Sequence, residues 1–190
     1  AKNELEMMYI LDPMTGIYNR RGFYQKYEEF LVKQQGGYVS VVSVDLDRLK
    51  PLNDTYGHQE GDFAIKSLGE ALKEMVGENG LCARFGGDEF VAILHHDKKM
   101  DNITEVLWND MVERLEQKRR ALLKPYAIRT SLGVVQEPMS ANMDIDALIS
   151  KSDKLLYEMK RLHHEQEDEA LEKAQNVTQS ILNHPLFEAL

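Results

Sequence analysis

Hydrophobic residues return every three or four positions in five stretches of the chain, which is the spacing of one helix face. The first predicted helix lies between the Thr-Gly turn at 15–16 and the glycine pair at 36–37. A short and a longer helix follow across 50–77 with a Gly-His break between them, and helices are also predicted at 103–123 and 144–164. The residues expected to face inwards are Phe23, Tyr27, Phe30 and Leu31 in the first helix, Ala64, Leu68, Leu72 and Met75 in the third, Val106, Met111, Leu115 and Leu122 in the fourth, and Leu148, Leu155, Leu156 and Met159 in the fifth.

Four runs of β-branched and apolar residues predict strands. Residues 38–47, YVSVVSVDLD, read as a central strand that is covered on both faces and ends in acids. Residues 81–85 and 89–94 flank a Gly-Gly turn and predict a β-hairpin, and residues 126–135 predict the last strand. This order predicts an α/β (α+β) fold with a βαββαβ core, a mixed sheet with a central hairpin, and helices on its faces.

The chain is expected to form one domain with two appendages. Residues 1–11 resemble the end of an upstream linker helix, residues 12–164 hold the predicted core, and residues 165–190 follow a highly charged break. In this C-terminal extension the residues Leu171, Ala174, Ile181 and Leu182 give a weak apolar stripe. We therefore expect a trailing helix that packs on the domain or on a partner.

Composition narrows the classes of partner. With 43% hydrophobic and 29% charged residues among 190, the chain is typical of a soluble globular protein. It has no apolar run of about 18 residues, so we expect this domain to make no membrane contact. Its one cysteine, Cys82, indicates a cytoplasmic location, which also suits the cytosolic portion of a larger sensor protein. A net charge of −9 disfavours long nucleic acids. A small phosphorylated ligand remains open, because a metal ion and a few local bases can offset its charge.

Acids at the first strand end and in the hairpin turn are the candidate chemistry. Side chains alternate along a strand, so Asp45 and Asp47 share one side and Leu46 takes the other. If the turn at 86–89 lies beside this strand end, three or four carboxylates converge, and they repel each other unless a cation neutralises them. Hard oxygen ligands in small number suit Mg²⁺. For the turn taken alone, a solvated acidic loop is an equal alternative.

Five blocks of sequence resemble GGDEF-domain diguanylate cyclases. They are RFGGDEF at 84–90, DPMTGIYNRRGF at 12–23, VDLDRLKPLNDTYGHQEGD at 44–62, SLGV at 131–134 and SDKLLYEMK at 152–160. They stand in the family's order, so the chain is identified as a member. The resemblance implies a palm-like core related to nucleotidyl cyclases. It also implies a reaction in which two GTP condense to cyclic di-GMP and two pyrophosphates, within a homodimer whose facing domains each hold one GTP.

The resemblance also implies a metal site. Its ligands would be Asp45, the backbone carbonyl of Leu46, Asp88 and Glu89, and its ion Mg²⁺ or Mn²⁺. Asp88, Glu89 and Lys50 are the implied catalytic residues, with Asp88 proposed to accept the proton of the 3′-hydroxyl. A carboxylate bound to Mg²⁺ is a weak base, which leaves the identity of the general base open.

The implied GTP-binding residues are Asn53, Asp62, Leu49, Lys50 and Lys160. Asn53 and Asp62 would read guanine, since a carboxylate accepts from N1–H and from the N2 amino group and adenine offers no such pair. A wrong base would leave these groups unpaired at a cost of about 1–3 kcal/mol each. Helix caps are the alternative for Asn53 and Asp62, and solvated surface residues for the two lysines.

Two departures from the family pattern matter. His164 stands where the family often has a phosphate-binding arginine, with Arg161 nearby. Residues 77–80, GENG, lack the arginine and aspartate of the family's inhibitory product site, so we expect no product inhibition through it.

The leading hypothesis is an active diguanylate cyclase domain fused to an upstream sensor domain. A second is a weak or inactive GTP-binding module that signals by interaction. A third is a mononucleotide cyclase on the same scaffold, which would form an intramolecular product.

Overall fold

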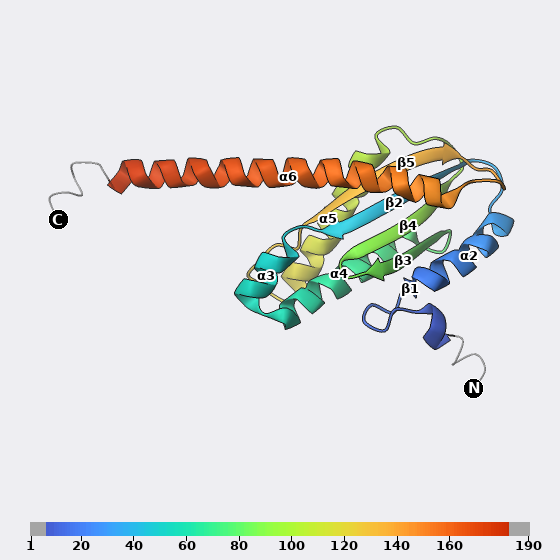
Figure 1. Cartoon of the computed structure of the whole chain (residues 1–190), viewed down its shortest axis with the longest axis horizontal. Coiled ribbons are helices and arrows are strands. Elements are labelled where there is room, and N and C mark those ends of the chain that lie inside the picture. The colour runs from blue at the N-terminus through green and yellow to red at the C-terminus, as the bar shows by residue number, and fades with distance from the viewer. Residues whose placement is uncertain (1–6, 183–190) are drawn as a thin grey trace.

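In the computed structural model, which describes residues 7–182, a five-stranded mixed sheet carries helices on both faces (Figure 1). The strands lie in the order β1-β3-β4-β2-β5, and all neighbours are antiparallel except β1 and β3. The strands are β1 Tyr18–Asn19, β2 Tyr38–Leu46, β3 Gly80–Gly86, β4 Glu89–His96 and β5 Thr130–Pro138. The helices are α2 Arg20–Lys33, α3 Leu49–Tyr56, α4 His58–Val76, α5 Ile103–Ala121 and α6 Ile145–Leu182. The predicted βαββαβ order and the central hairpin are confirmed.

Strand β2 is the centre of the sheet, because β4 and β5 pair with it on either side along nearly its whole length. Its alternate side chains enter two separate cores. Val42, Val44 and Leu46 pack with α4 and α5, whereas Val39 and Val41 pack with α2 and α6. The same alternation places Asp45 on the α2 and α6 side of the sheet, at the carboxyl end of the strand.

The predicted inner faces of α2 and α4 are confirmed, with Leu31 and Met75 only partly buried. On α5 the predicted face is partly wrong. Val106 and Leu122 are exposed, and Ile103 and Leu107 are buried with Met111 and Leu115 instead. The buried four are each four positions apart and so share one face, whereas Val106 lies five positions from Met111, about 140° around the helix.

The last strand and helix also differ from the prediction. Strand β5 begins at Thr130, four residues later than expected, and runs to Pro138. On α6, Leu155 is half exposed at the edge of the contact with the sheet. The expected break at 165 is wrong, since α6 is one continuous helix. Its acidic stretch contains no glycine or proline, and Arg161 pairs with Glu165 one turn on, which favours helix.

Beyond the sheet, α6 leaves the body of the domain and projects past it (Figure 1). The parts of the predicted N-terminal and C-terminal appendages at 1–6 and 183–190 lie outside the described residues. Strand β1, at two residues, is too short for any periodic pattern to predict. No helix between residues 7 and 182 combines the length and the apolar character needed to cross a membrane.

Candidate functional site

Asp45 stands at the carboxyl end of β2, directly across from Glu89 on β4 and Ser131 on β5. Its side chain is 17% exposed and turned toward α6. Its Oδ2 accepts a hydrogen bond from Lys160 Nζ at 2.6 Å, and the same ammonium donates to the backbone carbonyl of Leu46 at 3.1 Å. Its Oδ1 is buried and accepts no hydrogen bond within the described part of the chain.

The charge state of Asp45 is unusual. Burial and the neighbouring Asp88 carboxyl raise its pKa from 3.8 to about 7, although Lys160 acts in the opposite direction. The Lys160 ammonium lies between the Asp45 carboxylate and the Leu46 carbonyl. These two oxygens are the ones predicted to bind a metal ion. An unpartnered buried oxygen beside them gives the site the donors that a hard cation prefers. The residues present therefore fit such an ion.

Arg84 stabilises the hairpin turn that carries Asp88. Gly87 adopts a left-handed backbone, with φ +50°, which favours glycine. Arg84 Nε donates to the Gly87 carbonyl at 2.8 Å, and its Nη1 donates to Asp12 Oδ1 at 3.2 Å. Burial alone would raise the pKa of Asp12, but hydrogen bonds from Thr15 and the charge of Arg84 hold it below its usual value. Sequence reasoning assigned Arg84 no role, and its place in the motif was the only signal.

Asp47 does not join the acidic pair. It is buried, accepts from Ser131 Oγ at 2.8 Å and lies 3.1 Å from His163 Nδ1 on α6. It shares the α6 side with Asp45, as predicted, but β2 has ended at Leu46 and the chain turns Asp47 toward β5. Among residues 7–182, no group of three or more His, Cys, Asp or Glu side chains is close enough together to hold a metal ion. The expected meeting of three or four carboxylates is therefore not seen among the described residues; Asp45 and Asp88 come together, and Glu89 lies directly across from Asp45 but is exposed.

The two residues predicted to read guanine lie on successive helices. Asn53 is inside α3 and Asp62 is the fifth residue of α4, whose N-cap is Gly57, so neither caps a helix. The Asn53 Oδ1 is buried and makes no hydrogen bond to any described residue. It lies so close to Gly61 that a Cβ there would be 1.8 Å away. The close contact between α3 and α4 therefore fixes the position of the Asn53 amide, while its oxygen makes no hydrogen bond to a described residue.

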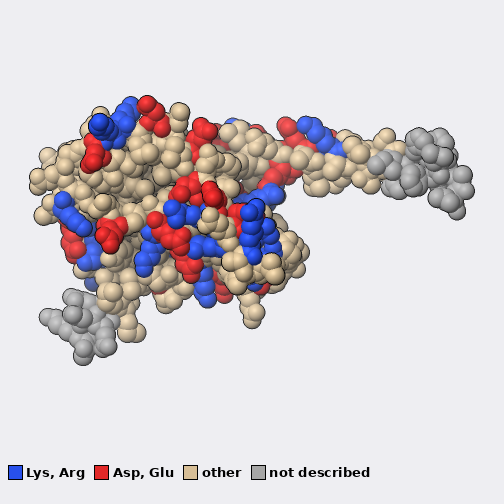
Figure 2. Space-filling view, turned by 180° about the vertical axis from the view of Figure 1, so that it is seen from behind, with Lys and Arg blue, Asp and Glu red and all other residues tan. Residues whose placement is uncertain are grey.

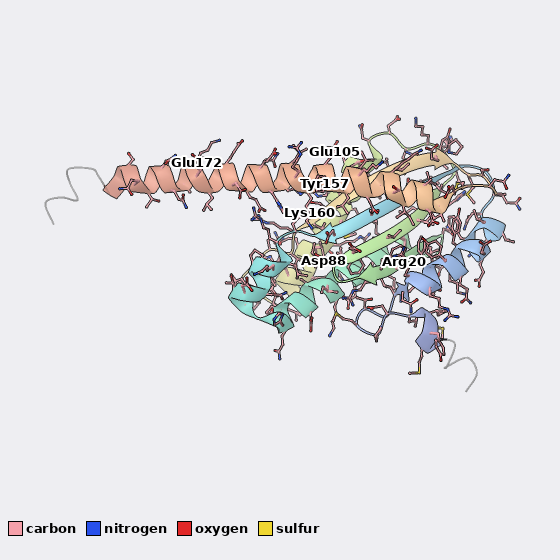
Figure 3. All side chains as sticks on the ribbon, viewed as in Figure 1. Arg20, Asp88, Glu105, Tyr157, Lys160 and Glu172 are labelled. Atoms are coloured by element: carbon pink, nitrogen blue, oxygen red, sulfur yellow. The ribbon has the colours of Figure 1, made fainter. Side chains whose placement is uncertain are left out.

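The residues predicted to hold phosphates are only partly brought together. Lys160 on α6 and Asp88 in the hairpin turn lie at the same end of the sheet (Figure 3). Lys50 is 85% exposed and pairs with Asp54 at 2.8 Å. Leu49 is half buried against the core. His164, one turn after Lys160, has a buried Nε2 that finds no hydrogen bond in the described structure.

The fold and the site together define a class of protein. It is a palm-like α+β domain in which acidic side chains meet at one strand end, close to polar atoms that make no hydrogen bond to the described residues. The family model described as "Diguanylate cyclase, GGDEF domain" matches residues 9–166, and the chain belongs to this family. The resemblance found in the sequence is thereby confirmed.

Named relatives agree with this assignment. The probable diguanylate cyclase DgcJ of Escherichia coli K12 is 35% identical over 150 residues, which are 78% of this chain and 29% of that protein. Diguanylate cyclase DgcS of Shewanella oneidensis is 30% identical over 161 residues, or 83% of this chain and 51% of that protein. The chain thus spans about half or less of the length of these relatives.

The fold is that of solved GGDEF domains. The coiled coil and GGDEF domain of DgcB from Caulobacter crescentus, solved in complex with c-di-GMP, superimposes with a TM-score of 0.67 at 22% identity. The match covers 84% of this chain and 85% of that one. This likeness confirms the predicted palm-like nucleotidyl-cyclase architecture.

Proposed function

We propose that this domain is a diguanylate cyclase that joins two GTP into cyclic di-GMP with release of two pyrophosphates. The observation that carries the proposal is the Asp45–Asp88 pair, with the Lys160 ammonium lying between the Asp45 carboxylate and the Leu46 carbonyl. Two neighbouring, partly buried carboxyl groups repel each other and so destabilise the fold, whereas a reaction on triphosphates can use them to hold a cation.

The metal site we propose consists of Asp45, the carbonyl of Leu46, Asp88 and Glu89. The unpartnered Asp45 Oδ1 supports it, as does the ammonium already held by two of these groups. A bound Mg²⁺ or Mn²⁺ would offset triphosphate charge and polarise the α-phosphate. Lys160, displaced from Asp45 and carried on a flexible side chain, would then be free to pair with phosphate oxygens.

Guanine selection falls to Asn53 and Asp62. The buried, unpartnered amide oxygen of Asn53 supports this, because native structures rarely leave such an atom without a hydrogen bond unless it has another use. Asp62 is half buried at the start of α4, where its carboxylate can accept from the N1–H and N2 donors of guanine.

One domain offers one such site, so the proposed reaction needs a second copy. In a facing pair, each 3′-hydroxyl attacks the α-phosphate of the opposite GTP, a new P–O bond forms, and pyrophosphate leaves. Asp88 is the proposed proton acceptor, although a metal-bound carboxylate is a weak base. Positioning and charge compensation then supply most of the rate.

The test is product formation from GTP and Mg²⁺ by the purified chain. Asp88→Asn should lower the rate at least about 100-fold, as loss of a key electrostatic group does in other enzymes. Asp101→Asn, at an exposed aspartate outside the site, is the matched control and should keep full rate. An Asp88→Asn variant that retains full synthesis refutes the metal assignment.

The second candidate is a GTP-binding module that acts through interaction. His164 in the place of an arginine and Lys50 turned to Asp54 favour it. Nucleotide binding with no cyclic dinucleotide would establish this alternative. A product that forms at a rate per molecule independent of protein concentration would instead indicate an intramolecular cyclase. An upstream sensor domain and a cytoplasmic location stay predictions.

A further inference from the structure

The long helix α6 runs in the same direction as β2 and continues past its carboxyl end. Ser152 on α6 is hydrogen-bonded to Ser43, and eight residues later Lys160 reaches Asp45. Side chains from 168 to 180 are all exposed. We define residues 169–182 as the arm; at 1.5 Å per residue it is about 20 Å long. Figure 1 shows it projecting beyond the domain at the end of the sheet that holds the candidate site.

The root of the arm is fastened to the loop that follows β2. Arg48 donates to Glu167 at 3.0 Å and to Asp168 at 2.9 Å, and Arg129 also pairs with Glu167. Arg48 has a left-handed backbone, with φ +57°, immediately before α3. These ion pairs connect the start of the arm to the loop beside the candidate site.

The face of α6 that packs on the sheet continues along the arm as an apolar stripe. Inside the domain this face carries Ile145, Ile149, Ser152, Leu156 and His163, and in the arm it carries Ala170, Leu171, Ala174, Val177 and Thr178. Leu171 and Val177 are each 59% exposed. Residues 174–182 contain no charged side chain, in a chain that is 29% charged. In Figure 2 the part of the arm next to the grey atoms is accordingly uncharged.

At its root the stripe enters a hollow of about 950 Å³ between the arm and α5. The apolar part of its lining is Trp108, Val112 and Ile128 on one side and Ala170 and Leu171 on the other, and most of the remaining lining residues are charged or polar. Helices gain most of their stability by packing an apolar face, and the described residues leave Leu171 and Val177 of the stripe exposed. The stripe and the hollow therefore form one continuous surface suited to another helix.

Two observations indicate a second copy of this chain as the occupant. The arm extends past the edge at which, on the proposed function, the partner domain must lie. Two arms related by a two-fold axis across that edge run antiparallel. Charge favours the same arrangement, because residues 165–173 hold five acids and one lysine whereas 174–182 hold no charge. Antiparallel pairing sets the uncharged tip of one arm against the acidic root of the other and avoids acid against acid.

We propose that the arm is a dimerisation element: in the facing pair, the arms of two copies pack antiparallel, stripe against stripe, with each tip directed to the hollow of the other copy. The inference rests on the proposed function for the direction of the partner. It assigns the pairing of the two half-sites to the arm, the part of α6 that lies beyond the residues of the candidate site.

The experiment is sedimentation equilibrium of the full chain with two matched variants. Val177→Asp places a charge in the stripe, and Asn176→Asp adds the same charge one residue away on the polar face. We expect Val177→Asp to weaken dimerisation at least 10-fold and Asn176→Asp to change it less than 3-fold. Far-UV circular dichroism checks that both variants keep the helix. A Val177→Ser variant, which removes the apolar side chain without adding charge, should also weaken the dimer.

Equal dimerisation of all the variants overturns the proposal, as does an equal loss in Val177→Asp and Asn176→Asp. A wild-type chain that stays monomeric at concentrations where it makes product overturns it too. The GTP assay separates the two claims. Arm-dependent dimers without any cyclic dinucleotide would leave the arm pairing standing and remove the proposed function.

Discussion

Replacing Asp45 by Asn should make the metal-free domain more stable at alkaline pH. In the folded protein, burial and the Asp88 carboxyl raise the pKa of Asp45 from 3.8 to about 7. Between these two values the folded state holds a proton that the unfolded chain has released. The unfolding free energy contributed by this group therefore falls as pH rises from about 4 to 7, and the loss is complete above pH 7.

The magnitude follows from the shift. About three pKa units at about 1.4 kcal/mol each give a ceiling of about 4 kcal/mol. The effect of Lys160 is already contained in this shift, because its ammonium lowers the pKa of Asp45. Side effects of the amide itself are independent of pH. The advantage of D45N over wild type should thus grow by about 2–4 kcal/mol between pH 4 and pH 8.

Urea unfolding, followed by the fluorescence of Trp108, measures this difference at each pH. Trp108 is the sole tryptophan of the chain. Asp97→Asn, at an exposed aspartate, is the matched control and should show no such growth. Mg²⁺ at pH 8 should stabilise wild type, since an ion that binds only the folded state raises its stability, and it should not stabilise D45N.

Parallel pH curves for wild type and D45N would refute the reasoning, because they would mean that Asp45 is not buried against a second carboxylate. Equal stabilisation of both proteins by Mg²⁺ would refute the assignment of Asp45 as a ligand while leaving the pair of acids intact.

Three further expectations test other parts of the site. Gly61→Ala should displace the Asn53 amide and raise KM for GTP about 10-fold, with little change in stability. Initial rates and urea unfolding measure the two effects, and an unchanged KM contradicts the role of Asn53. Arg84→Ala should cost about 2 kcal/mol, because it leaves the partly buried Asp12 carboxylate with only its Thr15 hydrogen bonds, and Arg84→Lys should recover part of this; a loss below about 0.5 kcal/mol would show the pair to be unimportant. Added cyclic di-GMP should not inhibit through residues 77–80, and a Glu78→Ala, Asn79→Ala double variant at two exposed positions should respond to it as wild type does; an inhibition of wild type that this variant relieves contradicts the expectation.

Local pattern predicted the elements well where periodicity was long and unambiguous. The run from Tyr38 to Leu46 has a nearly continuous apolar sequence, and only a strand covered on both faces suits it. On α5 apolar residues occur on two neighbouring faces, so the periodicity does not single out one of them, and the predicted face is partly wrong. Val106 and Leu107 are adjacent, and only the path of α5 over the sheet decides which is buried.

The sequence by itself determined the family, the order of strands and helices, and the presence of acids at the end of β2 and in the hairpin turn. These depend on residue type and on spacing over a few positions. Only the tertiary structure decided that Lys160 meets Asp45 across 115 positions, that Asp47 turns to His163, and that α6 continues past the sheet as an exposed arm. Such contacts depend on how the whole chain returns to one strand end, and no local spacing encodes that path.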